Sequence, residues 1–384
     1  MILRFDEQDK FRAHASRSLA VALRIEKDLA VIADVQKNPG PRNLHQLMAY
    51  CIRQMGRDPI GLSGHELYSM SIGSSDLPAV LENTINKAVS VGYNEAAPSF
   101  LAFTKEDETE NFNPKKLIKM SNFSDIDDLP EGTPFKNKKL SDKYESIQVS
   151  TKGNVCTVTR QAMINDDTDS LSQIPRLMGA AVARRRNQDA YDLLTFNNLA
   201  GPLTNEDGKA VFHADHSNLI ENSGTPSVSS IGAAERKLME MPALKAEPGD
   251  SDSFMNLPAR YLIAGAANKI TINQLLFSGI DPNASISGVF NPYSAGAIIP
   301  VVDAYLQAKL TAAGKANAFY IAADKEMLPS LTICYLSGSR EPIVRQEPSR
   351  IGAAQGITFE IYSDWGYVFE DFRGIIFNDG ATAG

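Results

Sequence analysis

Two histidines and an aspartate lie close together in the sequence, at His213, Asp215 and His216. Imidazole nitrogens and carboxylate oxygens are common zinc ligands, and a bound metal ion can activate water for hydrolysis. The spacing His-x-Asp-His is not that of HExxH, which places two histidines on one side of a helix. The surrounding residues predict a loop or a strand edge. The alternatives are therefore a metal site and a histidine held by hydrogen bonds in a loop.

No nucleotide-binding or nucleophile motif is complete in this sequence. The nearest candidate for a phosphate loop, residues 264–267, has a single glycine and lacks the closing Gly-Lys-Ser/Thr, and no GxSxG occurs. An acidic group is a candidate cation site, with a solvated turn as the simpler interpretation. Its members are Asp125, Asp127, Asp128 and Glu131.

Arg184, Arg185 and Arg186 are consecutive within a predicted helix. Successive helical residues point about 100° apart, so these guanidinium groups cannot form one compact anion site. We interpret them as a solvated face or as charges that pair with the acidic groups of a neighbouring chain. Trp365, the only tryptophan, lies beside the predicted C-terminal strands and is expected to anchor a core or an interface.

The totals are those of a globular protein with room for two or three domains, since the chain has 384 residues and 43% hydrophobic content. The formal charge of −8 argues against strong binding of nucleic acid. Three cysteines that lie far apart predict reduced thiols and no zinc knuckle. The N-terminus does not have the pattern of a signal peptide, and no apolar run has the length of a membrane span. We therefore expect synthesis in the cytoplasm.

Apolar residues at helical spacing predict that the first part of the chain is mainly helical. Ser63 and Glu66 have the spacing of a capping box for a short helix. Because proline is tolerated only in the first turn, Pro175 places the start of a long helix near Asp169 or Ser172. The predicted helices cover residues 9–35, 43–55, a short helix from 63, a segment from about 76, and about 169 to 196.

Residues 104–143 are polar and rich in turn residues, which is unusual inside a compact domain. A long β-hairpin that reaches away from the body explains this composition better. The second half of the chain alternates strands and helices, so the predicted fold class is α+β. The predicted strands cover residues 259–264, 298–302, 319–322, 331–336, 358–362 and 374–377, and the predicted helices cover 228–239, with Ser229 or Ser230 as cap, and 267–277.

Several residue runs from Ser74 onward carry a resemblance to a known family. They are Thr159-Arg160-Gln161-Ala162, Ile164-Asn165-Asp166-Asp167, Ile174-Pro175-Arg176, Tyr191-Asp192-Leu193-Leu194 and Asp207-Gly208-Lys209-Ala210-Val211-Phe212-His213. In residue order these runs resemble the major head subunit of Mu-like tailed phages and prophages. The resemblance covers most of the chain, and the run from Thr159 to Leu219 is its most specific part.

This resemblance implies the Hong Kong 97-type capsid fold, an α+β architecture. It implies an extended hairpin called the E-loop, a spine helix in a peripheral domain, and an axial domain whose tips meet at capsomer centres. The first segment is expected to be a helical extension that acts as a scaffold or as a clamp. The implied segments are residues 1–73 (extension), 74–112 (N-arm), 113–150 (E-loop), 151–204 with 353–384 (peripheral domain) and 205–352 (axial domain).

The implied function is structural, without catalysis or a cofactor. Copies of the chain are expected to form hexamers and pentamers and a closed icosahedral head around double-stranded DNA, which they contact only weakly. Expected partners are the portal, a scaffold or maturation protease, and decoration proteins, with assembly in the bacterial cytoplasm and no membrane. The alternatives are the shell of an encapsulin-like nanocompartment and a metal-dependent hydrolase that uses His213, Asp215 and His216.

The resemblance also points to candidate assembly contacts. The E-loop lysines are candidates for the covalent cross-links that some relatives form between subunits, with ordinary exposed lysines as the alternative. The expected contact residues are Lys136, Lys138, Lys139, Lys143, Arg184, Arg185 and Arg186.

Overall fold

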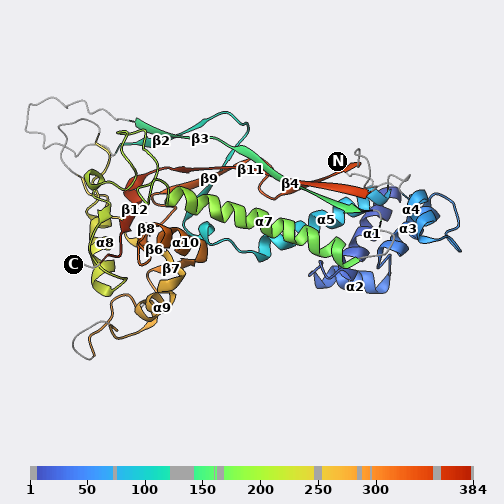
Figure 1. Cartoon of the computed structure of the whole chain (residues 1–384), viewed down its shortest axis with the longest axis horizontal. Coiled ribbons are helices and arrows are strands. Elements are labelled where there is room, and N and C mark those ends of the chain that lie inside the picture. The colour runs from blue at the N-terminus through green and yellow to red at the C-terminus, as the bar shows by residue number, and fades with distance from the viewer. Residues whose placement is uncertain are drawn as a thin grey trace, which may run out of the picture. The chain divides into compact units, whose positions relative to one another are not determined.

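The computed structural model of the chain is shown in Figure 1. It describes residues 7–71, 76–121, 142–159, 161, 168–245, 253–282, 288–294, 296–348 and 356–381. The chain forms two compact units, and each unit is built from segments that are distant in the sequence. The first unit comprises Met1–Ala97, Thr151–Arg185 and Gly338–Asp364, and the second comprises Pro98–Ser150, Arg186–Ser337 and Trp365–Gly384.

The helices of the N-terminal segment share one apolar core within the first unit. Leu47 of α3, Leu81 of α5 and Phe359 of β11 are buried in it together. The described helices are α1 (Glu7–Ala22), α2 (Leu29–Lys37), α3 (Leu44–Gln54), α4 (Gly64–Ser71) and α5 (Asp76–Glu95), and β11 spans Gly356–Phe369. The N-terminal extension is therefore folded as part of this unit.

The prediction of one helix over residues 9–35 is wrong. The chain leaves the helix after Ala22, and Arg24 adopts a left-handed conformation with φ of 57°. A new helix then begins, because the Asp28 carboxylate accepts a hydrogen bond from the Ala30 amide at 2.9 Å. The predicted short helix from Ser63 is confirmed as α4. Its capping box is formed, because the Glu66 carboxylate accepts a hydrogen bond from the Ser63 amide at 2.8 Å.

The long helix α7 (Thr168–Leu194) contributes residues to both units. It begins before both predicted starts, so Pro175 lies inside the helix and not in its first turn. Within the first unit, α5 and α7 approach each other through two glycines. A Cβ atom at Gly92 would lie 2.0 Å from the Arg176 carbonyl oxygen, and one at Gly179 would lie 2.1 Å from that of Val89. Only glycine permits this contact between the two backbones.

Strands complete the first unit. β10 (Ile343–Pro348) pairs antiparallel with β11, and β4 (Ser150–Thr159) also pairs with β11. The Thr151 hydroxyl donates to the Asp364 carboxylate at 2.5 Å, which links β4 and β11 through their side chains. The pairing and this hydrogen bond together hold β4 against β11.

The core of the second unit is a five-stranded mixed sheet in the order β5-β12-β8-β6-β7. Helices α8 and α10 contact this sheet (Figure 1), and the Ser227 hydroxyl caps α8 in a box with Ser230, in place of the predicted cap at Ser229 or Ser230. The elements are β5 (Leu219–Ile220), α8 (Val228–Met239), β6 (Ala259–Gly265), α9 (Lys269–Phe277), β7 (Ile299–Asp303), α10 (Ala304–Ala312), β8 (Phe319–Ala323) and β12 (Ile375–Asn378).

A second set of strands in this unit includes the predicted hairpin. β2 (Lys115–Met120) and β3 (Asp142–Ile147) pair antiparallel, which confirms the base of the hairpin, while residues 122–141 lie outside the described part. The polar segment before it is not part of the hairpin. β1 (Thr104–Thr109) instead pairs in parallel with β9 (Leu331–Leu336). Because β9 is buried, its backbone groups need hydrogen-bond partners, and β1 supplies them on one side.

Among the helices of the described ranges, none combines the length and apolar content that a membrane span needs.

Candidate assembly surfaces

The loop that carries His213, Asp215 and His216 is held by hydrogen bonds. The buried His216 ring places Nδ1 2.9 Å from the Val211 carbonyl oxygen and Nε2 2.9 Å from the Asp207 carboxylate. Nδ1 of His213 accepts the Asp215 amide at 3.1 Å. In the described part of the chain, no group of three or more His, Cys, Asp or Glu residues could hold a metal ion. The geometry therefore favours the hydrogen-bonded loop over the metal site.

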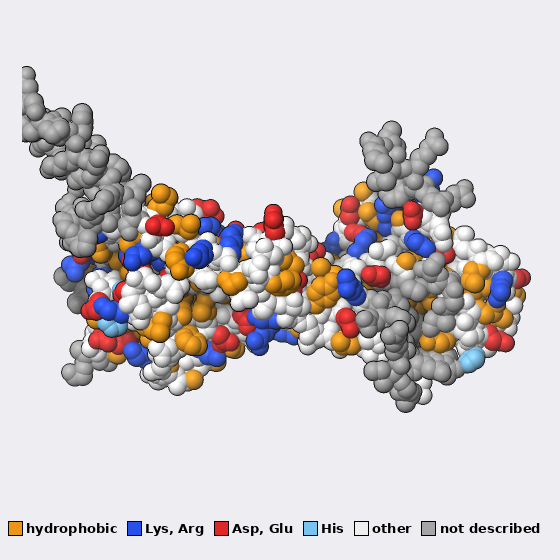
Figure 2. Space-filling model, turned by 90° about the horizontal axis from the view of Figure 1, so that it is seen from above, with side chains coloured by type: hydrophobic (Ala, Val, Ile, Leu, Met, Phe, Trp, Pro, Cys, Tyr) orange, Lys and Arg blue, Asp and Glu red, His pale blue; other side chains and the backbone are white. Residues whose placement is uncertain are grey.

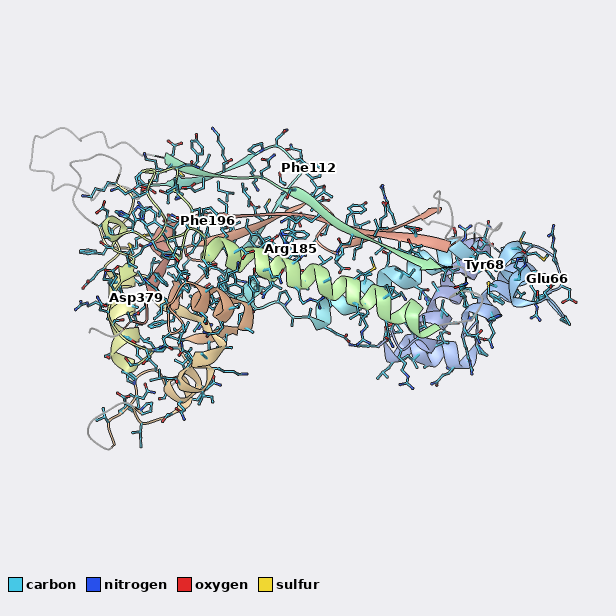
Figure 3. All side chains as sticks on the ribbon, in the orientation of Figure 1. Glu66, Tyr68, Phe112, Arg185, Phe196 and Asp379 are labelled. Atoms are coloured by element: carbon cyan, nitrogen blue, oxygen red, sulfur yellow. The ribbon has the colours of Figure 1, made fainter. Side chains whose placement is uncertain are left out.

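The β2–β3 hairpin has one buried and one exposed face, and both faces carry apolar side chains. On the exposed face, Ile118 stands opposite Tyr144 across the strands, and Ile118 and Met120 are 63% and 68% exposed. Phe112, labelled in Figure 3, is also exposed and lies between β1 and β2. The buried face packs in a cluster of Leu117, Ile147, Val149 and Cys334. Exposed apolar side chains such as Ile118 and Met120 are suited to packing against another protein surface.

One of the four predicted contact lysines falls within the described residues. Lys143 is on β3 and is half-buried. Lys136, Lys138 and Lys139 lie outside the described residues. The role of these lysines in assembly stays a prediction.

The three consecutive arginines divide between surface and core. Arg184 and Arg185 are exposed on α7, and Arg185 is labelled in Figure 3. Arg186 is fully buried, and its guanidinium carbon lies 4.8 Å from the centre of the Tyr335 ring and 5.1 Å from that of Trp365. The prediction that Arg186 is a surface contact is wrong, since two aromatic rings from distant strands enclose its charge. Trp365 anchors a core, which is one of its two predicted roles.

An exposed apolar area on and after α9 has no counterpart among the predicted sites. Ile270 and Phe277 are seven residues apart on α9 and are 73% and 66% exposed. The residues that follow form an isolated bridge between Ile280 and Phe290, which are 54% and 72% exposed. We call these four residues the α9 patch. The sequence indicates this patch because α9 carries apolar residues around most of its circumference, while a helix with one buried side needs them on that side only.

The face seen in Figure 2 carries charged side chains of both signs. On the face seen in Figure 2, Lys and Arg side chains are interspersed with Asp and Glu side chains. The described side chains on this face show no large basic area of the kind with which proteins hold a nucleic acid backbone, and the formal charge of the whole chain is −8.

Comparison with known proteins identifies the family. The model of the family described as phage capsid protein matches residues 143–378, which is more than half of the chain. No curated protein sequence matches the chain significantly. In the capsid structure of cyanophage P-SCSP1u, a chain is similar with a TM-score of 0.50 and 13% identity, over 74% of this chain and 88% of that chain.

Two further structures have lower TM-scores. A chain from Mycobacterium phage Adephagia has a TM-score of 0.47 and 12% identity over 74% of this chain and 89% of that chain. A chain from the capsid of the native GTA particle has a TM-score of 0.49 and 9% identity over 74% of this chain and 90% of that chain.

The matches confirm the predicted Hong Kong 97-type fold and the prediction of a structural protein, and they do not single out Mu-like phages. Neither the nanocompartment shell nor the metal-dependent hydrolase is favoured, and the chain is a structural protein of the virion capsid rather than an enzyme. The chain belongs to the phage capsid protein family.

Proposed function

We propose that this chain is the major capsid subunit of a tailed phage or prophage. Copies form hexamers and pentamers, and these capsomers close into an icosahedral head around double-stranded DNA. Weak contacts repeated over a closed shell give such a particle its stability.

The proposed roles of the segments follow the predicted boundaries. Residues 74–112 act as the N-arm, 113–150 as the E-loop, 151–204 with 353–384 as the peripheral domain, and 205–352 as the axial domain. The segment 1–73 acts as a clamp and not as a transient scaffold, and what supports this choice is its shared core with α5 and β11.

The observation that best supports assembly is the α9 patch. Three of its residues, Ile270, Phe277 and Phe290, are 66% or more exposed in the single chain. Burying large apolar side chains yields about 1.5–3 kcal/mol each, so copies that bring these patches together at a capsomer centre are stabilised. The exposed face of the hairpin supplies a second apolar surface for neighbouring copies.

The remaining partners follow from this role. The shell receives DNA through a portal, and a scaffold or maturation protease and decoration proteins act during assembly in the bacterial cytoplasm. The DNA is contacted only weakly, which the formal charge of −8 and the mixed charges of the visible face support. Arg184, Arg185 and Lys143 remain proposed contacts between subunits.

The proposal is tested by changing Phe277 and Phe290 to serine. We expect this double variant to fold but to assemble at least tenfold less readily, as measured by light scattering after size-exclusion chromatography. Phe196→Ser is the matched control, because Phe196 is also exposed, at 58%, but lies outside the patch (Figure 3). Equal assembly of the double variant and the native protein would argue against the axial contact.

A further inference from the structure

A cluster of buried charges lies in the second unit, where the base of the hairpin meets the loop after α7. Lys119 of β2 and Glu145 of β3 have side chains that are only 8% and 6% exposed. Glu206 comes from the loop, and Arg373 and Asp371 come from the segment before β12, with side chains 8–11% exposed. Charged groups are seldom buried to this extent without pairing.

The charges pair across three segments of the chain. Lys119 Nζ lies 3.5 Å from the Glu145 carboxylate and 3.7 Å from that of Glu206. Arg373 donates to Glu206 with both terminal nitrogens, one of them at 3.0 Å, and its Nη1 also donates to Asp371 at 3.2 Å. Lys119 therefore joins the hairpin to the charged side chains of Glu206 and Arg373.

Glu145 makes a second link between the hairpin and the loop. Its carboxylate accepts the Asn205 backbone amide at 3.1 Å and the Asn205 side-chain amide at 2.9 Å. The loop and the hairpin are thus held by hydrogen bonds as well as by ion pairs, and most of these bonds end on one carboxylate. The protonation of Glu145 therefore bears directly on how firmly the hairpin is held.

The cluster has one carboxylate more than it has cations. Lys119 and Arg373 face Glu145, Glu206 and Asp371. Burial raises the pKa of Glu145 above its ordinary value, although Lys119 and the Asn205 amide oppose this. Burial also acts on Glu206, but there Arg373 and Lys119 together outweigh it and lower the pKa. Glu145 is therefore the member that takes up a proton first as the pH falls.

We propose that this cluster is a proton-binding latch, which holds the base of the hairpin more firmly when Glu145 is protonated. Protonation removes the excess negative charge and leaves Glu206 and Asp371 to balance Lys119 and Arg373. The protonated carboxyl group still has an oxygen that accepts from Asn205. The ligand of this site is a single proton.

The sign of the pH effect follows from linkage. Because the pKa of Glu145 is raised in the folded protein, its contribution to stability is present below the unfolded value and is lost as the pH rises through the folded value. Glu206 has a lowered pKa, so its contribution is lost only in acid. The latch is therefore firmest below the ordinary pKa of a glutamate and loosens as the pH rises through the raised pKa of Glu145.

One other titratable pair touches the cluster. The His216 ring stacks on Phe372 at 3.8 Å, and the Arg373 guanidinium lies 4.3 Å from the centre of the same Phe372 ring. His216 faces Asp207. Burial would raise the pKa of Asp207, but hydrogen bonds from Thr204 and His216 hold this pKa well below its usual range. The test must therefore separate the contribution of Glu145 from that of this neighbouring pair.

The consequence for assembly rests on the proposed function. If neighbouring copies pack on the exposed face of the hairpin, then a firmer latch presents that face in one orientation and lowers the entropy cost of the contact. The latch itself is a property of the folded chain and does not depend on shell formation.

The test is hydrogen–deuterium exchange of the β2 and β3 amides in the full-length protein between pH 5 and pH 8, expressed as protection factors. We expect protection to fall as the pH rises, by up to tenfold per pH unit, which is the slope of one proton. In Glu145→Gln the slope should disappear, and protection at pH 8 should exceed that of the native protein. Asp142→Asn, an exposed change in the same hairpin, should keep the native slope.

The proposal is overturned if Glu145→Gln keeps the native slope, since the proton would then bind at another group. If Glu145→Gln does not fold, Lys119→Met provides the second test, because loss of the cation should move the fall in protection to higher pH. An unchanged midpoint in that variant also overturns the proposal. Electron microscopy of the same samples tests shell formation separately, so the latch and the capsid function can fail independently.

Discussion

Replacing Gly179 with alanine tests whether α5 and α7 meet backbone to backbone. The added Cβ would lie 2.1 Å from the Val89 carbonyl oxygen and 2.9 Å from the Tyr93 amide nitrogen. Ordinary contacts of a Cβ atom begin at 3.4 Å, so the local separation of the two helices must increase by more than 1 Å. Because the obstructing atoms belong to the backbone, no change of side-chain rotamer can relieve the clash.

The expected cost follows from two opposing effects. Overpacking a well-packed contact costs typically about 1–3 kcal/mol, and a backbone clash belongs at the upper end. Alanine in a helix interior is favoured over glycine by about 1 kcal/mol. We therefore expect Gly179→Ala to lower the free energy of unfolding by about 2 kcal/mol. With a urea m-value of about 2 kcal/mol/M, the midpoint falls by about 1 M.

The assay is urea unfolding followed by far-ultraviolet circular dichroism. The matched control is Gly232→Ala in α8, where the nearest atom to the added Cβ is the Tyr293 hydroxyl at 3.4 Å. Without a clash, helix propensity predicts that this control gains about 0.5–1 kcal/mol. The two alanines thus have opposite predicted signs.

A double variant provides a further check. Gly92→Ala opens the same helix contact, because its Cβ would meet the Arg176 carbonyl oxygen at 2.0 Å. Once one alanine has separated the helices, the second should cost less, so the double variant should lose less than the sum of the single variants. A stabilised Gly179→Ala variant, or full additivity, would refute the close contact.

Three more outcomes follow from contacts in the first unit. Arg12→Met removes the 2.8 Å ion pair with the buried Asp76 carboxylate, which should cost about 1–3 kcal/mol and speed proteolysis of the N-terminal helices; an unchanged cleavage rate would contradict this. Leu47→Ala, at a fully buried position, should cost about 2–5 kcal/mol in urea unfolding, and a cost under about 1 kcal/mol would place Leu47 outside the core. The Asp28 amide and Lys87 lower the pKa of Glu26 despite partial burial, so the stability that Glu26 contributes is present above pH 4.5 and is lost as the pH falls. Glu26→Gln should therefore reduce the acid sensitivity of the melting temperature, and an identical pH profile would count against the contact.

The periodic elements could be predicted from the sequence because their apolar faces are local signals. The stripes over residues 43–55 and 228–239 correspond to α3 and α8, and the buried strands β6, β8 and β9 appear where apolar runs occur. The break before α2 was missed because the apolar spacing continues across it. It depends on the left-handed backbone of Arg24, for which the side chain gives no signal.

The surfaces were harder to predict because they depend on contacts between distant segments. Arg186 looked exposed, since nothing nearby in the sequence indicates the rings of Tyr335 and Trp365 that enclose it. The buried charges Lys119 and Arg373 also come together only in the folded chain. For His216 the hydrogen-bonded alternative could be proposed in advance, although its partner Asp207 could not.

Electron microscopy of the full-length protein, with the mass of its N-terminus measured on the same sample, tests the central claim most directly. The account predicts closed shells, or rings or tubes of hexamers, in which the N-terminal helices are still present. A protein that stays strictly monomeric at high concentration would contradict the capsid function. Shells whose subunits lack residues 7–71 would contradict the clamp.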